Sequence, residues 1–133
     1  MQLPRTLVNQ LLAQAQSQPE QEICGLIGGN DRQPPRCYPV ANVAADPSHR
    51  YRLDPAQQID AMRRMREKGE RLLAIYHSHP HGPARPSATD LREAQYPEAV
   101  YLIISLGTTG VLEMRGFRLR DGHVEEVELE LTD

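Results

Sequence analysis

The chain has 133 residues, a formal net charge of −3 at pH 7 and 39% hydrophobic residues. This length is typical of one domain and is enough to bury a core without disulfide bonds. The weakly acidic charge argues against non-specific binding to nucleic acids or anionic membranes. No apolar run reaches the roughly 20 residues of a membrane span, and the start of the chain lacks the apolar segment of a secretory signal. We therefore expect one cytoplasmic domain over residues 1–133 that binds neither nucleic acids nor membranes.

The first part of the chain predicts one helix followed by two strands. Apolar residues recur at helical spacing over 7–15, which predicts an amphipathic helix that ends before Pro19. The segment 23–29 predicts a short strand that runs into a glycine turn. The segment 36–43 predicts a second strand, and Pro39 within it favours a position at the edge of a sheet.

The middle of the chain predicts a helix and two buried strands. Asp54 before Pro55 indicates a helix start, since aspartate caps helices and proline suits the first helical position. Gly69 supplies the C-terminal stop. The apolar runs 72–76 and 99–106 then predict central strands, because they offer apolar side chains to both faces of a sheet.

The last part of the chain predicts a hairpin. A turn is expected at 107–110, a strand over 111–119 and a tight turn at 121–122. Apolar and acidic residues alternate over 126–131, which indicates a strand with one wet face, and Val124 is out of phase, which predicts a bulge at the next residue. Two or three helices and about six strands result. We predict an α/β fold with a mixed β-sheet flanked by helices.

The stretch YHSHPHGPARPSATD, residues 76–90, is rich in side chains that bind metals. Residues two apart on a strand point to the same face, so His77 and His79 could both reach one cation. Ser87 has the features of a helix N-cap. It therefore places Asp90 at the third helical position, where the carboxylate can fold back toward the histidines.

Two imidazoles and one carboxylate with an open fourth position are typical of a catalytic zinc site. Zinc lowers the pKa of water toward about 7, and a second carboxylate is then needed to take the proton. Glu22, at the start of the strand 23–29, is the candidate. Each part also has a simpler interpretation. The segment 87–90 is a plausible capping box, the histidine pair could lie on a loop surface, and Glu22 could be an exposed acid.

The remaining histidines and the cysteines show no comparable pattern. His49, His81 and His123 lie in predicted loops and turns, and we assign none of them to the metal. Cys24 lies in an apolar strand without a basic partner, so a packed core thiol is favoured over a nucleophile. Cys24 and Cys37 form no CxxC pair and no disulfide framework.

Together these residues resemble the motif of the JAMM or MPN+ metallopeptidases. That motif is a glutamate, a later His-Ser/Thr-His-Pro and a later Ser-x-x-Asp, with ten residues between the second histidine and the aspartate. All of its positions are present here, from Glu22 through HSHP at 77–80 to SATD at 87–90. The stretches EICGLIGG and PARPS are similar to the small stand-alone bacterial members, and the resemblance covers the whole chain.

The resemblance implies a zinc-dependent (iso)peptidase of deubiquitinase type on an MPN fold akin to that of cytidine deaminases. It implies that His77, His79 and Asp90 ligate one zinc ion. Glu22 would be the general base that activates water and passes the proton to the leaving amine. Ser87 would hydrogen-bond the oxyanion, and its hydroxyl can do so while it also accepts a bond as helix cap.

The stand-alone bacterial members resemble peptidases that trim ubiquitin-like sulfur carrier proteins, whose tails end in Gly-Gly. One known activity releases cysteine from a carrier–cysteine adduct. This chain lacks the insertions with which relatives specific for ubiquitin chains hold a second ubiquitin. We therefore expect the bond after Gly-Gly to be cut and cysteine or a short peptide to be released. MPN domains often pair, so the resemblance also implies a homodimer.

Three other interpretations stay open. The chain could be a non-catalytic MPN module that binds partners, although such modules typically lack the ligands that are present here. It could be a RadC-type relative associated with DNA repair, although it is acidic and has no helix-hairpin-helix region. It could also be a phage-tail-type peptidase, which the metal motif alone does not exclude.

Overall fold

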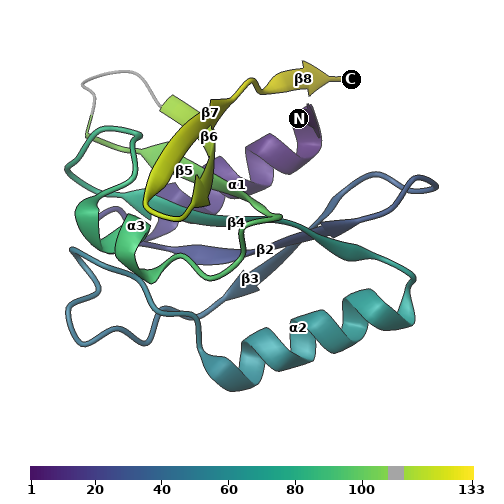
Figure 1. Cartoon of the computed structure of the whole chain (residues 1–133), viewed down its shortest axis with the longest axis horizontal. Coiled ribbons are helices and arrows are strands. Elements are labelled where there is room, and N and C mark those ends of the chain that lie inside the picture. Colours follow the sequence, from purple (N-terminus) through teal and green to yellow (C-terminus); the bar gives the residue numbers. More distant parts are fainter. Residues whose placement is uncertain (108–112) are drawn as a thin grey trace.

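A computed structural model describes residues 1–107 and 113–133 and shows a mixed six-stranded sheet with helices on both faces (Figure 1). β4 and β5 run parallel, and the other neighbouring strands of this sheet are antiparallel. The predicted α/β class is confirmed. In spatial order the strands are β3 (Arg36–Val40), β2 (Cys24–Gly29), β4 (Arg71–His79), β5 (Val100–Ser105), β6 (Glu113–Arg120) and β7 (His123–Val127).

The helices begin and end where local signals place them. The described helices are α1 (Arg5–Ser17), α2 (Pro55–Glu67) and α3 (Ala88–Glu93). The Asp54 side chain accepts a hydrogen bond from the backbone N–H of Ala56 at 3.1 Å and so caps α2. Gly69, just past the end of α2, has φ +70°, a conformation that glycine adopts without strain.

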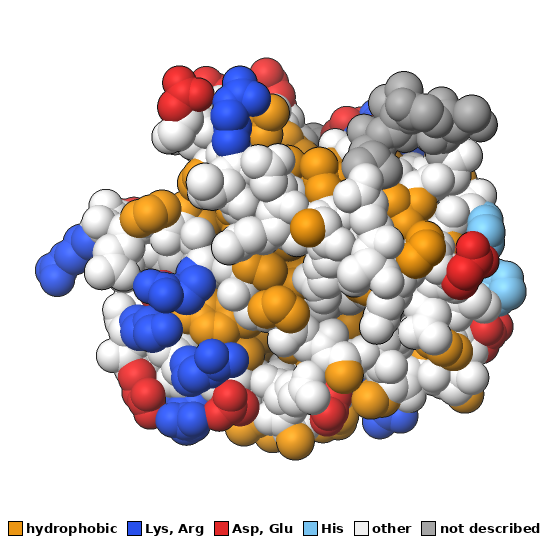
Figure 2. Space-filling view, turned by 180° about the vertical axis from the view of Figure 1, so that it is seen from behind, with side chains coloured by type: hydrophobic (Ala, Val, Ile, Leu, Met, Phe, Trp, Pro, Cys, Tyr) orange, Lys and Arg blue, Asp and Glu red, His pale blue; other side chains and the backbone are white. Residues whose placement is uncertain are grey.

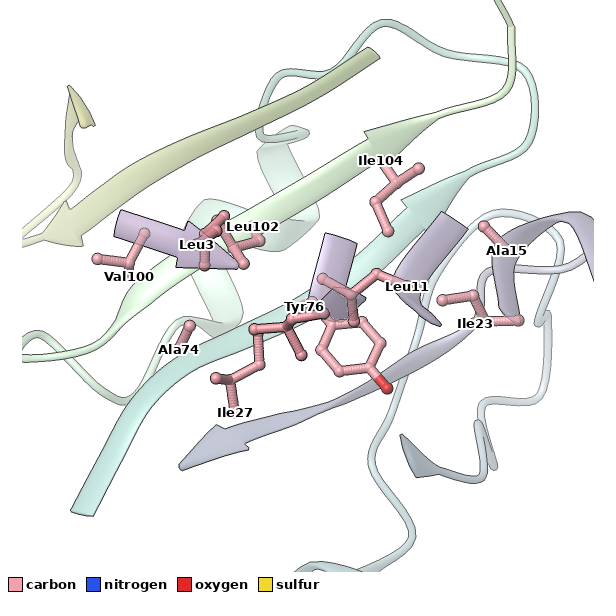
Figure 3. Close-up of a cluster of buried hydrophobic side chains, with 11 residues drawn as sticks. Leu3, Leu11, Ala15, Ile23, Ile27, Ala74, Tyr76, Val100, Leu102 and Ile104 are labelled. Carbon is pink, nitrogen blue, oxygen red and sulfur yellow. The ribbon is translucent and has the colours of Figure 1, made fainter. Parts of the chain in front are cut away.

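Two apolar clusters cover the two faces of the sheet. Because neighbouring residues on a strand point to opposite faces, β4 sends Tyr76 toward α1 and Ile75 toward α2. Leu7 and Leu11 of α1 pack on the first face, and Figure 3 shows Leu11 above Tyr76. Met65 of α2 packs on the second face. Each fully buried side chain of this kind stabilises the fold by about 1.5–3 kcal/mol, so both clusters hold β4 and β5 rigidly.

The packing of β2 against β4 depends on a glycine. A Cβ atom on Gly25 would meet the hydroxyl end of Tyr76 and the backbone oxygen of Tyr38. The Tyr76 hydroxyl donates a hydrogen bond to the Gln14 side chain at 2.6 Å. Because the two strands approach so closely, Glu22, which lies two residues before β2, is brought to the C-terminal end of β4.

β4 is longer than predicted. The apolar run predicted a strand over 72–76, whereas β4 spans Arg71–His79. His77 and His79 are therefore part of the strand and share its rigidity. The residues 77–79 pair with Ile103, Ile104 and Ser105 of β5, so polar side chains are held within a fully formed ladder.

The prediction for the end of the chain was wrong. Glu125 pairs with Arg118 of β6 in regular register, so there is no bulge there. The phase change falls instead at a break after Val127, beyond which β8 (Glu130–Thr132) pairs in parallel with β1 (Gln2–Pro4) in a second, two-stranded sheet. β7 is an exposed edge strand, so its side chains need not alternate against a core. β1 was not predicted at all.

Parts of the predicted hairpin lie outside the described residues. The turn expected at 107–110 and the strand start expected at 111 fall largely on residues 108–112. β6 is described from Glu113, and the predicted turn at 121–122 is confirmed by the positive φ of Asp121 and Gly122. No helix in the described part of the chain is long and apolar enough to cross a membrane.

Candidate metal centre

Four buried side chains meet at the C-terminal end of β4. Glu22, His77, His79 and Asp90 each offer a ligand atom, and these atoms lie within 4.8 Å of one another. The two histidines share one face of β4 because they are two residues apart. Their Nε2 atoms lie 3.1 Å apart, and Asp90 Oδ2 lies 3.1 Å from each of them. The sequence prediction that these side chains converge is confirmed.

This triangle of donor atoms suits one zinc ion. Two ligands of a tetrahedral zinc ion at bond lengths of about 2.0–2.1 Å lie about 3.3 Å apart, close to the 3.1 Å separations here. Neutral imidazole and carboxylate are donors that zinc accepts readily. Three protein donors leave a fourth position open, which is the composition of a catalytic zinc site.

The charges of the donors also suit a cation. Burial lowers the pKa of His77, which keeps its imidazole neutral and able to bind a metal. Burial alone would raise the pKa of Asp90, but hydrogen bonds with His77 and His79 outweigh it and hold that pKa well below its usual range. Asp90 therefore stays ionised, although only 7% of the residue is exposed.

Neighbouring groups fix the two imidazole rings. The His79 Nδ1 atom lies 2.8 Å from the Pro83 carbonyl oxygen. A proton on Nδ1 donates to that oxygen, so the ring stays oriented when a metal takes the place of the Nε2 proton that faces Asp90. The His77 ring is held differently: Tyr51 stacks on it, with ring centroids 4.3 Å apart and ring planes 20° apart.

Glu22 lies beside the donor triangle and is held through its backbone. Its N–H donates to the Pro47 carbonyl at 2.7 Å, and its carbonyl accepts from the Asn42 side chain at 2.8 Å. The carboxylate Oε1 is buried and, among the described residues, has no hydrogen-bond partner. Burial raises the pKa of Glu22 to about 8, partly offset by His79. An unpartnered carboxyl with such a pKa can both accept and return a proton near neutral pH.

Ser78, between the two histidines, ties β4 to the segment that carries Glu22. Its Oγ accepts a hydrogen bond from the Ile23 N–H at 2.9 Å, and its own N–H donates to the Ile23 carbonyl at 3.0 Å. Ile23 follows Glu22 directly. The serine therefore fixes the distance between the glutamate and the histidine pair, a role that the sequence analysis did not assign to it.

Ser87 caps α3 as predicted. Its Oγ accepts from the Asp90 N–H at 3.0 Å, and Asp90 Oδ2 accepts from the Ser87 N–H at 2.9 Å. This reciprocal capping box turns Asp90 back toward the histidines. The Ser87 residue is exposed, and its hydroxyl proton is not used by the cap, so it can donate to a further group.

Asn42 is a second residue that the sequence analysis missed. It occupies no recognisable motif, and its importance appears only when distant segments are brought together. Its side chain joins the strand start at Glu22 to the loop 44–53, which carries Tyr51. Besides Glu22, its partners are the Arg50 carbonyl at 3.0 Å, the Ala44 N–H at 3.0 Å and the Arg52 N–H at 2.9 Å.

The other candidate residues lie outside the cluster. The exposed His81 lies 3.5 Å from Glu20, and His49 lies 3.0 Å from Asp46. Cys24 is fully buried, and burial raises the pKa of its thiol to about 12. It is therefore a protonated core thiol at neutral pH, as predicted.

Two hollows open beside the cluster. The first, about 780 Å³, lies between the loop 44–53, the start of α2 and α3, and its wall includes Asp90 and Tyr51. The second, about 430 Å³, lies between the end of α1, the start of β2 and the end of β3, and its wall includes Glu22. Glu22 is not part of the wall of the first hollow.

The family of prokaryotic homologs of the JAB domain matches this sequence over residues 4–120. The chain belongs to this family. The JAB match spans Glu22, β2, both histidines, the α3 cap and the whole of β6. It confirms the resemblance that the motif predicted.

Curated relatives of this JAB chain include two named peptidases. The CysO-cysteine peptidase of Mycobacterium tuberculosis is 37% identical over 123 residues, which cover 90% of this chain and 83% of the relative. The probable TtuB-protein conjugate cleaving protease of Thermus thermophilus is 38% identical over 120 residues, which cover 90% of this chain and 76% of the relative. These two relatives and the buried metal cluster together identify this chain as a zinc-dependent peptidase of the JAMM type.

Solved structures agree on the JAB fold. Protein DSY2949 from Desulfitobacterium hafniense is 35% identical with a TM-score of 0.88, over 99% of this chain and 92% of that one. AF2198, a JAB1/MPN domain protein from Archaeoglobus fulgidus, is 20% identical with a TM-score of 0.65 over 100% of both chains. The predicted MPN fold is confirmed.

Proposed function

We propose that this JAB enzyme hydrolyses the peptide or isopeptide bond that follows the C-terminal Gly-Gly of a ubiquitin-like sulfur carrier protein and releases cysteine or a short peptide. The observation that carries this proposal is the buried cluster in which Glu22, unpartnered at Oε1, lies beside three metal donors. Two relatives, named for CysO-cysteine and for TtuB-protein conjugates, supply the substrate class.

We assign His77, His79 and Asp90 as the zinc ligands, on the basis of their mutual 3.1 Å separations, the lowered pKa of His77 and the ionised state of Asp90. Zinc held there polarises the scissile carbonyl and lowers the pKa of a water molecule. The fixed rings and the α3 cap keep the three donor atoms in place before the substrate arrives, so little reorganisation is needed at the moment of reaction.

Glu22 is the general base in this proposal. It takes a proton from the attacking water and delivers it to the leaving nitrogen as the bond to the carbonyl carbon breaks. Burial favours the protonated carboxyl of Glu22, so Glu22 can hold the proton between the two halves of this transfer. Ser87 donates its free hydroxyl proton to the oxygen that becomes negative in the tetrahedral state, while its Oγ keeps the bond from the Asp90 N–H.

These roles orient the substrate. The leaving nitrogen must face Glu22, so the leaving group lies on the side of the second hollow. The carrier tail then lies on the other side, in the hollow walled by Asp90 and Tyr51. An extended tail advances about 3.3 Å per residue. Two glycines therefore remove side chains over the stretch nearest the cluster, where the backbone must approach closely.

A carrier extended by cysteine after Gly-Gly provides the test. Zinc-loaded protein is expected to release cysteine, a chelator to stop release, and added zinc to restore it. Glu22→Gln should keep zinc and lose about 10²–10⁴-fold in rate. A wild-type rate in Glu22→Gln would overturn the base assignment, and no release by zinc-loaded wild type would overturn the substrate class. The cytoplasmic location and the homodimer stay predictions.

A further inference from the structure

The hollow beside Asp90 has an arginine-rich wall. Arg50 and Arg52 reach it from the loop 44–53, and Arg92 reaches it from α3. All three residues are exposed. A hollow of about 780 Å³ falls within the size range of ligand sites in proteins, about 300–1,000 Å³, so the three cations line a space large enough for a peptide segment.

These three guanidinium groups lack acidic partners. Within residues 1–107 and 113–133, none of them lies within 4.0 Å of a carboxylate, and the one side-chain bond among them joins Arg92 to the Thr89 hydroxyl at 3.2 Å. The acids on the wall are Asp90, which belongs to the metal cluster, and Glu93. Positive charge is therefore in surplus there.

Arg63 and Arg64 of α2, by contrast, have acidic partners. At the C-terminal half of α2, basic and acidic side chains lie next to each other (Figure 2). Arg63 alone contacts both Asp60 at 2.6 Å and Glu67 at 2.7 Å. Such pairs occupy the donors of a guanidinium. The unpaired arginines of the hollow keep theirs for a ligand, in the planar geometry that matches a carboxylate.

The backbone on which Arg50 and Arg52 stand is fixed. The Asn42 side chain bonds the Arg50 carbonyl and the Arg52 N–H, and the Arg52 carbonyl accepts from the Val43 N–H at 2.9 Å. Between them, Tyr51 is anchored on His77. The loop therefore holds the backbone of both arginines at the wall of the hollow, in a defined position relative to the metal cluster.

We propose that this hollow selects carrier tails with acidic side chains immediately before the Gly-Gly, and disfavours basic tails, through Arg50, Arg52 and Arg92. The inference rests on the proposed function, which places the tail in this hollow. It adds a charge requirement that the metal motif does not contain. Because these cations are exposed, the preference should weaken as salt increases.

Peptides that share a Gly-Gly-Cys end test the proposal. The two residues immediately before Gly-Gly are Glu-Glu, Gln-Gln or Arg-Arg. For each peptide, kcat and KM are measured with zinc-loaded protein at low and at high salt. The Glu-Glu peptide is expected to exceed Gln-Gln in kcat/KM by about tenfold or more, mostly through KM, with Arg-Arg lowest. Fluorescence anisotropy of labelled peptides on the Glu22→Gln protein reports binding without turnover.

A charge-reversed variant provides the second arm. Arg50→Glu with Arg52→Glu should reverse the order of the three peptides. The matched control is Arg66→Glu with Arg71→Glu, which changes the same charge at two exposed arginines that do not line the hollow. The control should keep the wild-type order.

The outcomes separate this inference from the proposed function. Equal cleavage of all three peptides would overturn the charge preference and leave the peptidase assignment intact. A preference that persists unchanged in Arg50→Glu with Arg52→Glu would also overturn it, since the arginines of the hollow would then not be its source. If nothing is cleaved, the proposed function fails, and the binding data alone decide the charge preference.

Discussion

Tyr51 lies almost flat against His77, with the two ring centroids 4.3 Å apart. The imidazole is fully buried and, within the described residues, has no hydrogen-bond partner at Nδ1. Metal-bound histidines usually donate this second nitrogen to a carboxylate or carbonyl. Here the stacked tyrosine ring takes over the task of orienting the imidazole.

Replacement of Tyr51 should therefore weaken zinc binding. Tyr51→Ala removes the stacked surface, and we expect zinc affinity to fall by about 10-fold or more, as for other groups that orient ligands. Tyr51→Phe keeps the ring and should bind zinc like wild type. Titration against a competing chelator measures both. An unchanged affinity in Tyr51→Ala would show that packing elsewhere fixes His77.

Asn42 should matter for turnover more than for zinc content. Asn42→Ala breaks the bonds that join Glu22 to the loop 44–53. Unfolding free energy should fall by about 0.5–1.5 kcal/mol, because exposed and partly buried backbone groups lose their hydrogen bonds to the side chain. The zinc stoichiometry should stay at one while kcat drops. Loss of zinc in parallel with kcat would place the effect on the ligands instead of on Glu22.

Glu22 should make the metal-free protein less stable as pH rises. Burial raises its pKa from 4.5 to about 8, so the unfolded chain loses this proton at lower pH than the folded one. The stability that the protonated Glu22 carboxyl contributes is fully present below about pH 4.5 and is lost as pH rises toward 8. Metal-free Glu22→Gln should therefore unfold at higher urea concentration than wild type at pH 8, with the two converging near pH 4.5.

Cys24 should resist alkylation. Its pKa is raised to about 12 by burial, and the thiolate is the form that reacts. Iodoacetamide at pH 8 should leave Cys24 unmodified in folded protein and modify it after urea is added, as peptide mass mapping can show. Rapid labelling of Cys24 under native conditions would contradict its assignment as an inert core thiol.

The parts of the site that were predictable follow from local rules. Two histidines two residues apart on a strand share a face, and a serine three residues before an aspartate can form a capping box. The convergence of His77, His79 and Asp90 could therefore be predicted from two short segments. The prediction that Glu22 lies close to these three residues relied on the JAMM motif, because no local rule connects it to them. The roles of Tyr51 and Asn42 depend on contacts between segments far apart in sequence, for which the chain carries no local signal.

The same distinction separates the fold predictions. The cap of α2 and the glycines Gly69 and Gly122 were located correctly because each is a property of a few neighbouring residues. The glycine turn expected at the end of the strand 23–29 was wrong, because Gly28 and Gly29 pair with β4 as part of β2. The bulge expected next to Val124 was wrong. On an exposed edge strand the side chains need not alternate between a core and solvent, so the order of apolar and acidic residues does not reveal a bulge. β1 escaped prediction because three residues form a strand here only when β8 lies beside them.

The pairing of β1 with β8 also has a consequence for biosynthesis. Leu3 is fully buried, and its strand partner is Leu131. A ribosome makes the chain from the N-terminus, so β1 has no partner until residues 130–132 have been made. α1 and the central strands can assemble in the meantime. The two-stranded sheet of β1 and β8, which brings Leu3 into the apolar cluster around α1, forms last. This step joins residues more than 120 positions apart, which is the slow kind of contact in folding.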